Sequence, residues 1–268
     1  MFTLFDILND KTILCEYIKA LNANKGKTLR EWLNYARNIC DGLPSEEILL
    51  SLVSEKSIKD KGLVGKIIEY GFFGQKPNCD SAPDIGALKC DIKSCAFKLV
   101  KKLGKNAKER QTITNCGNTK NYDSFQHILD HVQFEDCPYY EKSRQFLLCI
   151  RNDDKKKMKT VEELMTQPML LIVLVQLETL PLEMKTMIED DYKSIRQCVL
   201  EKRVSQKGQK YLHIHTHGAG HGSGNRAFGF TSAFITRVVA LQLAELHQKK
   251  MEDILIEGKS LAIKNEYL

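Results

Sequence analysis

The sequence predicts an α/β fold, in which a central mixed β-sheet is flanked by helices and a helical N-terminal segment packs beside it. Two observations support this prediction. Apolar residues recur at helical spacing through about the first sixty residues and in several later stretches. Short apolar runs of strand length lie between those stretches, but without the regular strand–helix–strand alternation of a doubly wound parallel fold.

Length and composition are those of a globular protein. The 268 residues suffice for one large domain or a domain with an appendage, and 43% are hydrophobic while 28% are charged. This balance excludes a disordered or fibrous chain. Forty Lys and Arg against 34 Asp and Glu give a formal charge of +6, which suits a polyanionic partner without requiring one.

The cysteines and the N-terminus bear on the compartment. The nine cysteines form no CxxC pair, and the first residues lack the basic region of a signal peptide. We therefore expect reduced thiols in a cytoplasmic protein. The most apolar run, Met169–Val175, is far too short to cross a bilayer and predicts a buried strand, so we expect no membrane partner.

The first hundred residues are expected to contain helices followed by a loop and a strand pair. The apolar spacing over Leu29–Ala36 is typical of the N-terminal helices. The pattern over Asp60–Tyr70 predicts a helix with Leu63, Ile67 and Tyr70 facing inward, and a loop over Gly74–Ala82 follows it. The segment Asp84–Ala96 is interpreted as a bent strand pair or hairpin. A helical segment over residues 1–60 and a second domain over 61–268 are the expected divisions.

Period and length predict the remaining elements. Further strands are expected at Gln111–Asn115, Gln145–Arg151, Met169–Gln176 and Lys210–His215. Further helices are expected at Tyr122–His131, Val161–Thr166, Leu182–Lys202 and Thr231–Lys249.

A group of acids and one lysine carries the chemistry. Pro83-Asp84 is followed seven residues later by Asp91-Ile92-Lys93. Alternation along a strand puts Asp91 and Lys93 on one face, with Ile92 in the core. A reversal of the chain between Gly86 and Leu88 would bring Asp84 beside Asp91.

Paired carboxylates of this kind favour a divalent cation. Two carboxylates held close together repel each other unless a cation lies between them, and Mg²⁺ prefers oxygen ligands. Lys93 can orient or deprotonate an attacking water, and Glu69, on the upstream helix, can accept a bond from Lys93 or hold a water of a second metal. Such a set suffices to hydrolyse a phosphodiester. Taken alone, the pattern is also that of a turn aspartate and a surface strand face.

The surrounding residues resemble a known family. Lys61-Gly62-Leu63-Val64-Gly65-Lys66-Ile67-Ile68-Glu69, then Pro83-Asp84, then Asp91-Ile92-Lys93 is similar to the motif series of the MutH-like branch of the PD-(D/E)xK nucleases. That branch includes a mismatch-repair nicking enzyme and several type II restriction enzymes. The resemblance implies a restriction-endonuclease-like core, with Asp84 and Asp91 as Mg²⁺ ligands and Lys93 and Glu69 as catalytic groups.

Weaker similarity extends over about Lys61–Leu241. Tyr140-Glu141-Lys142-Ser143, before an apolar strand, looks like a family segment that offers a further active-site lysine, here Lys142. The sequence departs from the family at Gly229, where an aromatic residue is common. It departs again at His215-Thr216-His217, where a basic stretch is common.

A histidine- and glycine-rich stretch runs from His213 to Arg226 and contains four of the seven histidines. We favour a DNA-contacting loop, because glycines let backbone N–H groups approach phosphates while polar side chains donate hydrogen bonds. The donors expected there are His215, His217, His221, Ser223, Asn225 and Arg226. The alternatives are a transition-metal site on His213, His215 and His217, and a mobile surface loop.

Together these expectations describe a type II restriction endonuclease that cleaves double-stranded DNA at a short sequence with Mg²⁺ and leaves 5′-phosphate ends. Either a monomer or a homodimer suits that role. Three alternatives remain open: a strand-nicking mismatch-repair endonuclease, a non-catalytic DNA-binding module of the same fold, and a metal hydrolase built on the histidines.

Overall fold

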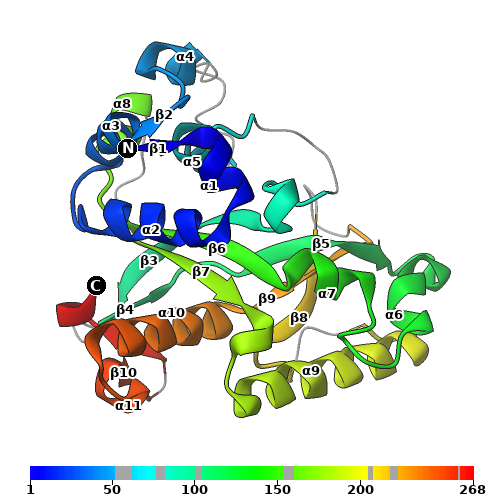
Figure 1. The fold of residues 1–268 in the computed structure, drawn as a ribbon. Coiled ribbons are helices and arrows are strands. Elements are labelled where there is room, and N and C mark those ends of the chain that lie inside the picture. Colours follow the sequence, from blue (N-terminus) through cyan, green and yellow to red (C-terminus); the bar gives the residue numbers. More distant parts are fainter. Residues whose placement is uncertain are drawn as a thin grey trace. The chain divides into compact units, whose positions relative to one another are not determined.

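The chain forms two compact units, each assembled from separate stretches of sequence. The computed structural model describes residues 1–51, 62–76, 82–100, 104–153, 160–204, 208–217, 223–258 and 260–268. The first unit comprises Met1–Leu99, Phe146–Val175 and Leu268, and the second comprises Val100–Gln145 and Gln176–Tyr267. Helices and strands occur in both, which confirms the predicted mixed α/β class (Figure 1). The expected division at residue 60 lies outside the described residues.

Helices dominate the N-terminal part of the first unit, as predicted. They are α1 (Leu4–Asn9), α2 (Lys11–Asn22), α3 (Leu29–Ile39), α4 (Glu46–Ser51) and α5 (Leu63–Phe73), with the short parallel strands β1 (Phe2–Thr3) and β2 (Cys40–Asp41). A capping box between Thr28 and Glu31 starts α3, since each side chain accepts a bond from the other residue's backbone N–H. Trp32 is fully buried on the inner face of this helix.

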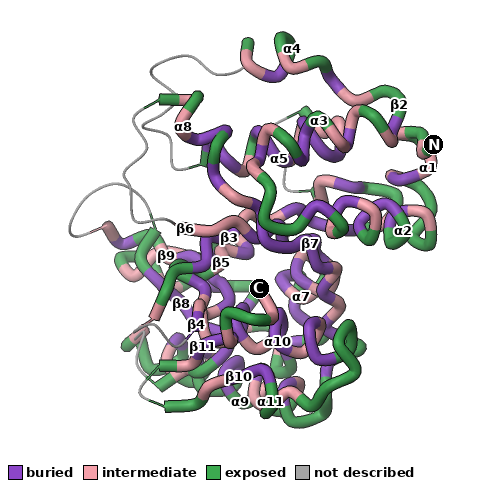
Figure 2. The backbone as a smooth tube through the Cα atoms, turned by 90° about the vertical axis from the view of Figure 1, so that its left-hand side faces the viewer, coloured by how far each residue is buried: buried purple, intermediate pink, exposed green. Residues whose placement is uncertain are grey.

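Three neighbouring strands, β3 (Asp91–Val100), β6 (Gln145–Asp153) and β7 (Met169–Gln176), form the sheet of the first unit, and the short helix α8 (Val161–Met165) precedes β7. β3 and β6 are parallel, with Asp91 opposite Phe146. The N-terminal helices cover one face of these strands (Figure 1), and Trp32, Phe72, Ile92 and Leu147 belong to one shared core. The buried segments of these helices and strands are purple in Figure 2. This core fixes the backbone on which the predicted acids stand.

The second unit contains an antiparallel sheet in the order β5 (Gln111–Asn118), β9 (Asn225–Phe230), β8 (Leu212–Thr216). The strands β4 (Gly104–Ala107), β11 (Ala262–Lys264) and β10 (Leu255–Ile256) also follow one another in antiparallel pairs. The helices of this unit are α6 (Gln126–Asp130), α7 (Pro138–Ser143), α9 (Leu182–Leu200), α10 (Ser232–His247) and α11 (Met251–Ile254). Helix α9 packs against β8, and α10 packs against β4.

A buried carboxylate joins α9 to β8. Asp191, on α9, is 6% exposed. Its Oδ1 accepts a bond from the Lys210 N–H at 2.9 Å, and its Oδ2 accepts from the N–H groups of Tyr211 at 2.5 Å and Leu212 at 2.9 Å. The charge is therefore solvated by backbone dipoles instead of water, and the entry to β8 is held in one position.

Most predicted elements are confirmed, and several strands were missed. The strand at Met169–Gln176 has the predicted bounds, and the helix predicted at Leu182–Lys202 ends two residues earlier, at Leu200. The inward residues of α5 are Leu63 and Ile67, as expected, but Tyr70 is only half-buried, and the buried positions continue at Gly71, Phe72 and Phe73 instead. The sequence did not predict the strands β1, β2, β4, β9, β10 and β11 or the short helices α7 and α11.

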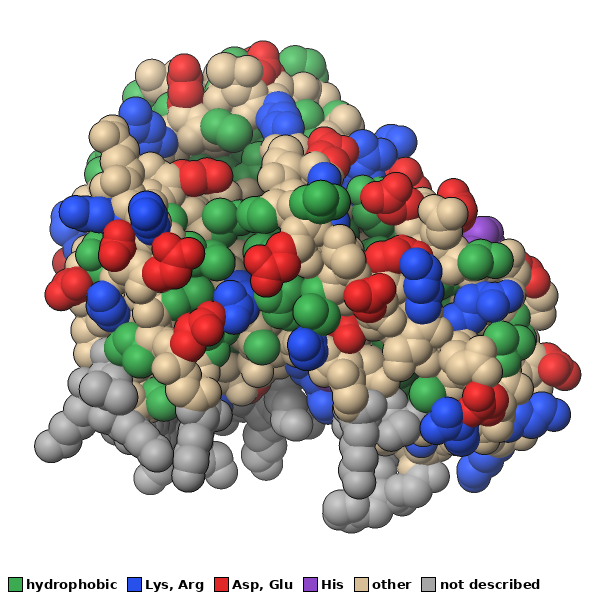
Figure 3. Space-filling view, turned by 90° about the horizontal axis from the view of Figure 1, so that it is seen from below, with side chains coloured by type: hydrophobic (Ala, Val, Ile, Leu, Met, Phe, Trp, Pro, Cys, Tyr) green, Lys and Arg blue, Asp and Glu red, His purple; other side chains and the backbone are tan. Residues whose placement is uncertain are grey.

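Charge of both signs is spread over the face that Figure 3 shows. In the coloured part of that view, Lys and Arg side chains are interspersed with Asp and Glu, and they form no continuous basic patch. Any attraction for a polyanion on this face must therefore come from local arrangements and not from a single-sign surface. No described helix combines the length and the hydrophobicity that crossing a bilayer requires.

Candidate active site

The chain reverses between Asp84 and β3, as the acidic pattern required. Ile85 and Cys90 exchange backbone hydrogen bonds of 2.9 and 3.1 Å, and the turn η2 (Gly86–Leu88) lies between them. Lys89 closes the turn in the left-handed region at φ 48°. The reversal brings the Asp84 carboxylate to the start of β3, where its Oδ2 accepts a bond of 2.7 Å from the Ile92 N–H.

The first residues of β3 present Asp91 and Lys93 on one face. Asp91 is 3% exposed, while the Lys93 side chain keeps 24% of its surface accessible. Lys93 Nζ lies 2.8 Å from Asp91 Oδ2. Ile92, between them, points into the core. Strand alternation therefore produces the predicted arrangement, and Lys93 offsets the cost of burying the Asp91 charge.

Glu69 faces this group from α5. Burial is the main cause that raises the pKa of its carboxyl to about 7, and the negative charge of Asp84 raises the pKa further, whereas Lys93 lowers it and Asp91 raises it. These influences require the four groups to lie near one another. Three carboxyl groups thus lie near Lys93 at the start of β3, and Lys66 also lowers the pKa of Glu69. Ionisation of all three would place negative charges close together, which a divalent cation would relieve.

The donor set suits magnesium better than a softer metal. It consists of carboxylate oxygens, and Mg²⁺ is typically held by one or two carboxylates together with waters and substrate phosphates. Within the described ranges, no three His, Cys, Asp or Glu side chains form a closed ligand cluster. This applies to Glu69, Asp84 and Asp91 as well as to His213, His215 and His217, so metal binding at either place stays a prediction.

Glu69 makes the stability of the metal-free protein depend on pH. The folded protein holds the Glu69 proton up to about pH 7, whereas an ordinary glutamate releases it near 4.5. A raised carboxyl pKa means that stability is fully present below the lower value and falls as pH rises to the higher one. We expect Glu69→Gln to melt a few degrees above the wild type at pH 8 in EDTA, and at the same temperature at pH 4.

Thermal unfolding of both proteins and of Glu47→Gln, an exposed glutamate on α4, measures this effect. The control substitution should change the melting temperature equally at the two pH values. If the difference in melting temperature between Glu69→Gln and the wild type did not vary with pH, the pKa of the Glu69 carboxyl would not be raised in the folded protein.

Lys142, the proposed further lysine, lies in the second unit. It is half-buried in the last turn of α7, next to Ser143, whose hydroxyl donates to the Tyr139 carbonyl at 2.8 Å. The catalytic role of Lys142 stays a prediction.

The histidine-rich stretch is mostly strand and not loop at its described ends. His215 is 2% exposed on β8, and its Nε2 lies 3.2 Å from the Thr112 hydroxyl. In this structure the His215 ring is enclosed by the second unit, so contact with DNA would require it to become exposed, and its DNA contact stays a prediction. Both faces of β8 are covered, since Leu212 and Ile214 are buried as well as His213 and His215, whose rings lie 4.8 Å apart on one face.

The other expected DNA contacts lie where β8 and β9 meet. His217 and Asn225 are exposed, and the Ser223 hydroxyl donates to the His217 carbonyl at 3.0 Å. The Arg226 guanidinium donates to the carbonyls of Ser223 and Asn225 at 2.8 and 3.0 Å. These groups hold the strand ends together, and their contact with DNA stays a prediction. His221 lies outside the described residues.

Gly229 explains one departure from the family pattern. A Cβ at this position would lie 2.4 Å from the Gln111 carbonyl oxygen on β5, closer than atoms can approach. An aromatic residue therefore has no room at position 229 unless β5 and β9 separate.

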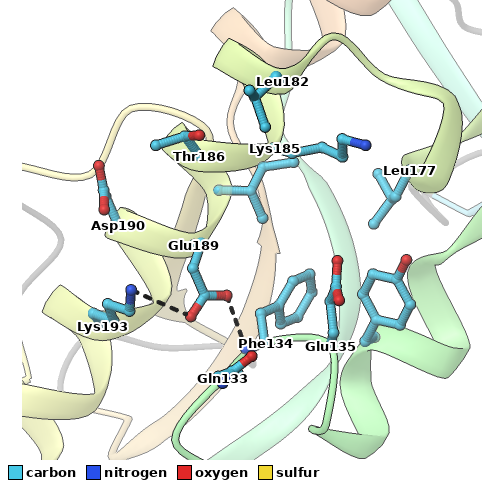
Figure 4. Close-up of a pocket in the computed structure, with 12 residues that line it drawn as sticks. Gln133, Phe134, Glu135, Leu177, Leu182, Lys185, Thr186, Glu189, Asp190 and Lys193 are labelled. Carbon is cyan, nitrogen blue, oxygen red and sulfur yellow. Dashed lines mark hydrogen bonds and ion pairs between the residues drawn. The ribbon is translucent and has the colours of Figure 1, made fainter.

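A pocket of about 450 Å³ occurs elsewhere in the second unit, between α9 and the loop before α7 (Figure 4). Glu189 accepts a 3.0 Å bond from the Phe134 N–H at its wall, and its other oxygen lies 3.8 Å from Lys193 Nζ. None of the predicted nuclease residues is among those that line this pocket.

Comparison with known proteins adds no constraint to this geometry. The chain matches no protein-family model, and no curated protein shows significant similarity to it.

Proposed function

We propose that this protein is a Mg²⁺-dependent endonuclease that hydrolyses double-stranded DNA. The observation that carries the proposal is the gathering of Asp84, Asp91 and Lys93 at the start of β3, with Glu69 facing them from α5. An acid pair with an adjacent lysine, backed by a hydrophobic core, is suited to cutting a phosphodiester with a metal-activated water. The family resemblance of the motifs agrees with this proposal.

Asp84 and Asp91 are the proposed metal ligands. A bound Mg²⁺ would stabilise the charge on the attacked phosphate and lower the pKa of a bound water. Asp91 is buried and cannot turn away, so its carboxylate keeps a fixed direction. Asp84 is held by the Ile92 N–H and by the backbone reversal, which leaves little freedom in the spacing of the two acids.

Lys93 and Glu69 are the proposed proton-handling groups. The Asp91 carboxylate positions the Lys93 amine, whose accessible part can hold the attacking water by a hydrogen bond. Glu69, with a pKa of about 7 when no metal is present, can accept a proton near neutral pH. Its ionised form would also add to the negative charge that attracts the cation.

Within this class we propose a type II restriction enzyme. Purified protein with Mg²⁺ alone should then cut both strands of a plasmid at a short sequence and yield discrete fragments with 5′-phosphate ends. Nicked circles without linear product would favour the strand-nicking repair enzyme instead. Gel-shift binding without any cleavage would favour a non-catalytic DNA-binding module.

The metal identity is tested in the same digestion. Activity should require Mg²⁺ and vanish in EDTA. Activity restored by Zn²⁺ and not by Mg²⁺ would overturn the carboxylate site in favour of the histidines. Lys98→Ala removes an exposed lysine farther along β3 and should leave cleavage unchanged. It is the control for Lys93→Ala, because it removes the same charge outside the proposed site.

A further inference from the structure

A second pocket of about 470 Å³ lies at one end of the sheet β5-β9-β8 in the second unit. Its lining comes from three segments: the turn Lys108–Arg110, the residues Gln209 and His213 around the start of β8, and Thr231 with Ser232 where α10 begins. These segments are far apart in the sequence, so the fold has to bring them together.

The strand register explains why they meet. Phe230, the last residue of β9, pairs with Gln111, the first residue of β5, and with Leu212, the first residue of β8. The chain therefore leaves all three strands at the same end of the sheet, just before Gln111, just before Leu212 and just after Phe230. The pocket lies between the three segments that begin there.

The walls on the β8 and α10 sides are fixed by hydrogen bonds. The Thr231 N–H donates to the Tyr211 carbonyl at 2.8 Å, and the Thr231 hydroxyl donates to the Lys210 carbonyl at 2.5 Å. Asp191 holds the same two residues from the other side through their N–H groups. The start of α10 is thus locked beside the start of β8, and the pocket is largely preformed.

Among the residues that the structure describes, three polar atoms in this wall have no hydrogen-bond partner. His213 is only 8% exposed and its Nε2 makes no hydrogen bond, and both the Oε1 and the Nε2 of Gln209 are likewise buried without a partner. A buried polar atom that makes no bond costs stability, and such atoms are few in folded proteins. Their concentration around one pocket indicates that a ligand completes their bonds.

The charge around the pocket favours an anion. Lys108 and Arg110 outnumber the carboxylate of Glu109, and the helix α10 directs the positive end of its dipole here. Burial, followed by the positive charge of Arg110, lowers the pKa of His213 to about 4, so its ring is neutral at pH 7. A metal cation would be repelled by the same arginine.

We propose that this pocket binds a phosphoryl oxyanion, with Arg110 and Lys108 supplying charge and His213, Gln209 and the first turn of α10 supplying hydrogen-bond donors. The phosphate can come from a DNA backbone or from a small phosphorylated compound, which present the same oxygens. The proposal does not depend on the nuclease function, because the pocket is built entirely from residues of the second unit.

Nuclear magnetic resonance titration of the full chain with inorganic phosphate tests the proposal. Phosphate should shift the His213 ring signals and the backbone amide signals of Ser232 and Ala233 in a saturable way, with a dissociation constant on the order of 1 mM. A short DNA duplex is then added to a separate sample. Shifts of the same signals that phosphate reverses identify the DNA backbone as the source, and their absence identifies a small phosphorylated compound.

Arg110→Ala should weaken phosphate binding about tenfold, as expected for loss of a charged hydrogen bond. Gln209→Ala, a second and independent variant, should weaken it several-fold. Lys249→Ala, which removes an exposed lysine after α10, should leave binding unchanged. Unshifted His213 and α10 signals at ten times the expected dissociation constant, or equal weakening by Arg110→Ala and Lys249→Ala, would overturn the proposal whatever the outcome of the cleavage assays.

Discussion

Asp84→Ala is expected to reduce DNA cleavage by roughly 10³-fold or more while DNA binding stays measurable, since it removes one of the two proposed metal ligands. Lys93→Ala should have an effect of similar size, because the amine next to Asp91 no longer orients the water. Plasmid cleavage under single-turnover conditions with Mg²⁺, together with a binding assay in Ca²⁺, measures the two effects separately.

The controls distinguish chemistry from folding. Lys93→Ala leaves the buried Asp91 charge unpaired and is destabilising by itself. Lys93→Arg keeps a positive partner for Asp91, yet its larger planar guanidinium cannot place a donor where the compact Lys93 amine lies, so cleavage should still fall about 10²-fold. Asp41→Ala, at an exposed aspartate on β2, should cut normally. Full activity of Asp84→Ala would refute the proposed site.

The second large effect concerns stability. Asp191→Ala is expected to destabilise the second unit by about 3 kcal/mol or more, since it leaves the N–H groups of Lys210, Tyr211 and Leu212 buried or half-buried without their acceptor. Denaturant unfolding measures the free energy, and amide hydrogen exchange at residues 210–212 locates the loss.

Asp190→Ala provides the matched control, because Asp190 is the neighbouring acid on α9 but is exposed. We expect it to change stability by less than about 0.5 kcal/mol. Similar values for the two variants would mean that the three bonds to Asp191 contribute no net stability. Asp191→Asn should fall between them, since an amide oxygen accepts bonds without carrying charge.

The parts of the fold that the sequence predicts are those with strong periodic signals. Met169–Gln176 is a continuous apolar run, and strand β7 has those bounds. By contrast, β9 contains Gly229 and follows a glycine-rich stretch, so its composition resembles a loop. Its strand structure comes from pairing with β5 and β8 on both sides, which no local pattern reveals.

The candidate active site was predictable because its residues are close in sequence. A proline–aspartate pair, a short reversal and an alternating strand place Asp84, Asp91 and Lys93 by local rules alone. The phosphate pocket was not predictable. Arg110, His213 and Ser232 come together only through the register of three strands, and no spacing along the chain encodes that.

The interleaving of the two units in sequence constrains how this protein can be made and divided. The first unit needs both residues 1–99 and residues 146–175, because strand β3 pairs with β6 across the intervening stretch of the second unit. A fragment that ends anywhere between these strands carries an incomplete sheet, with an open edge prone to aggregation. During synthesis on the ribosome, β3 is therefore made before its partner β6. We expect slow folding, because this pairing joins strands that are far apart in the sequence.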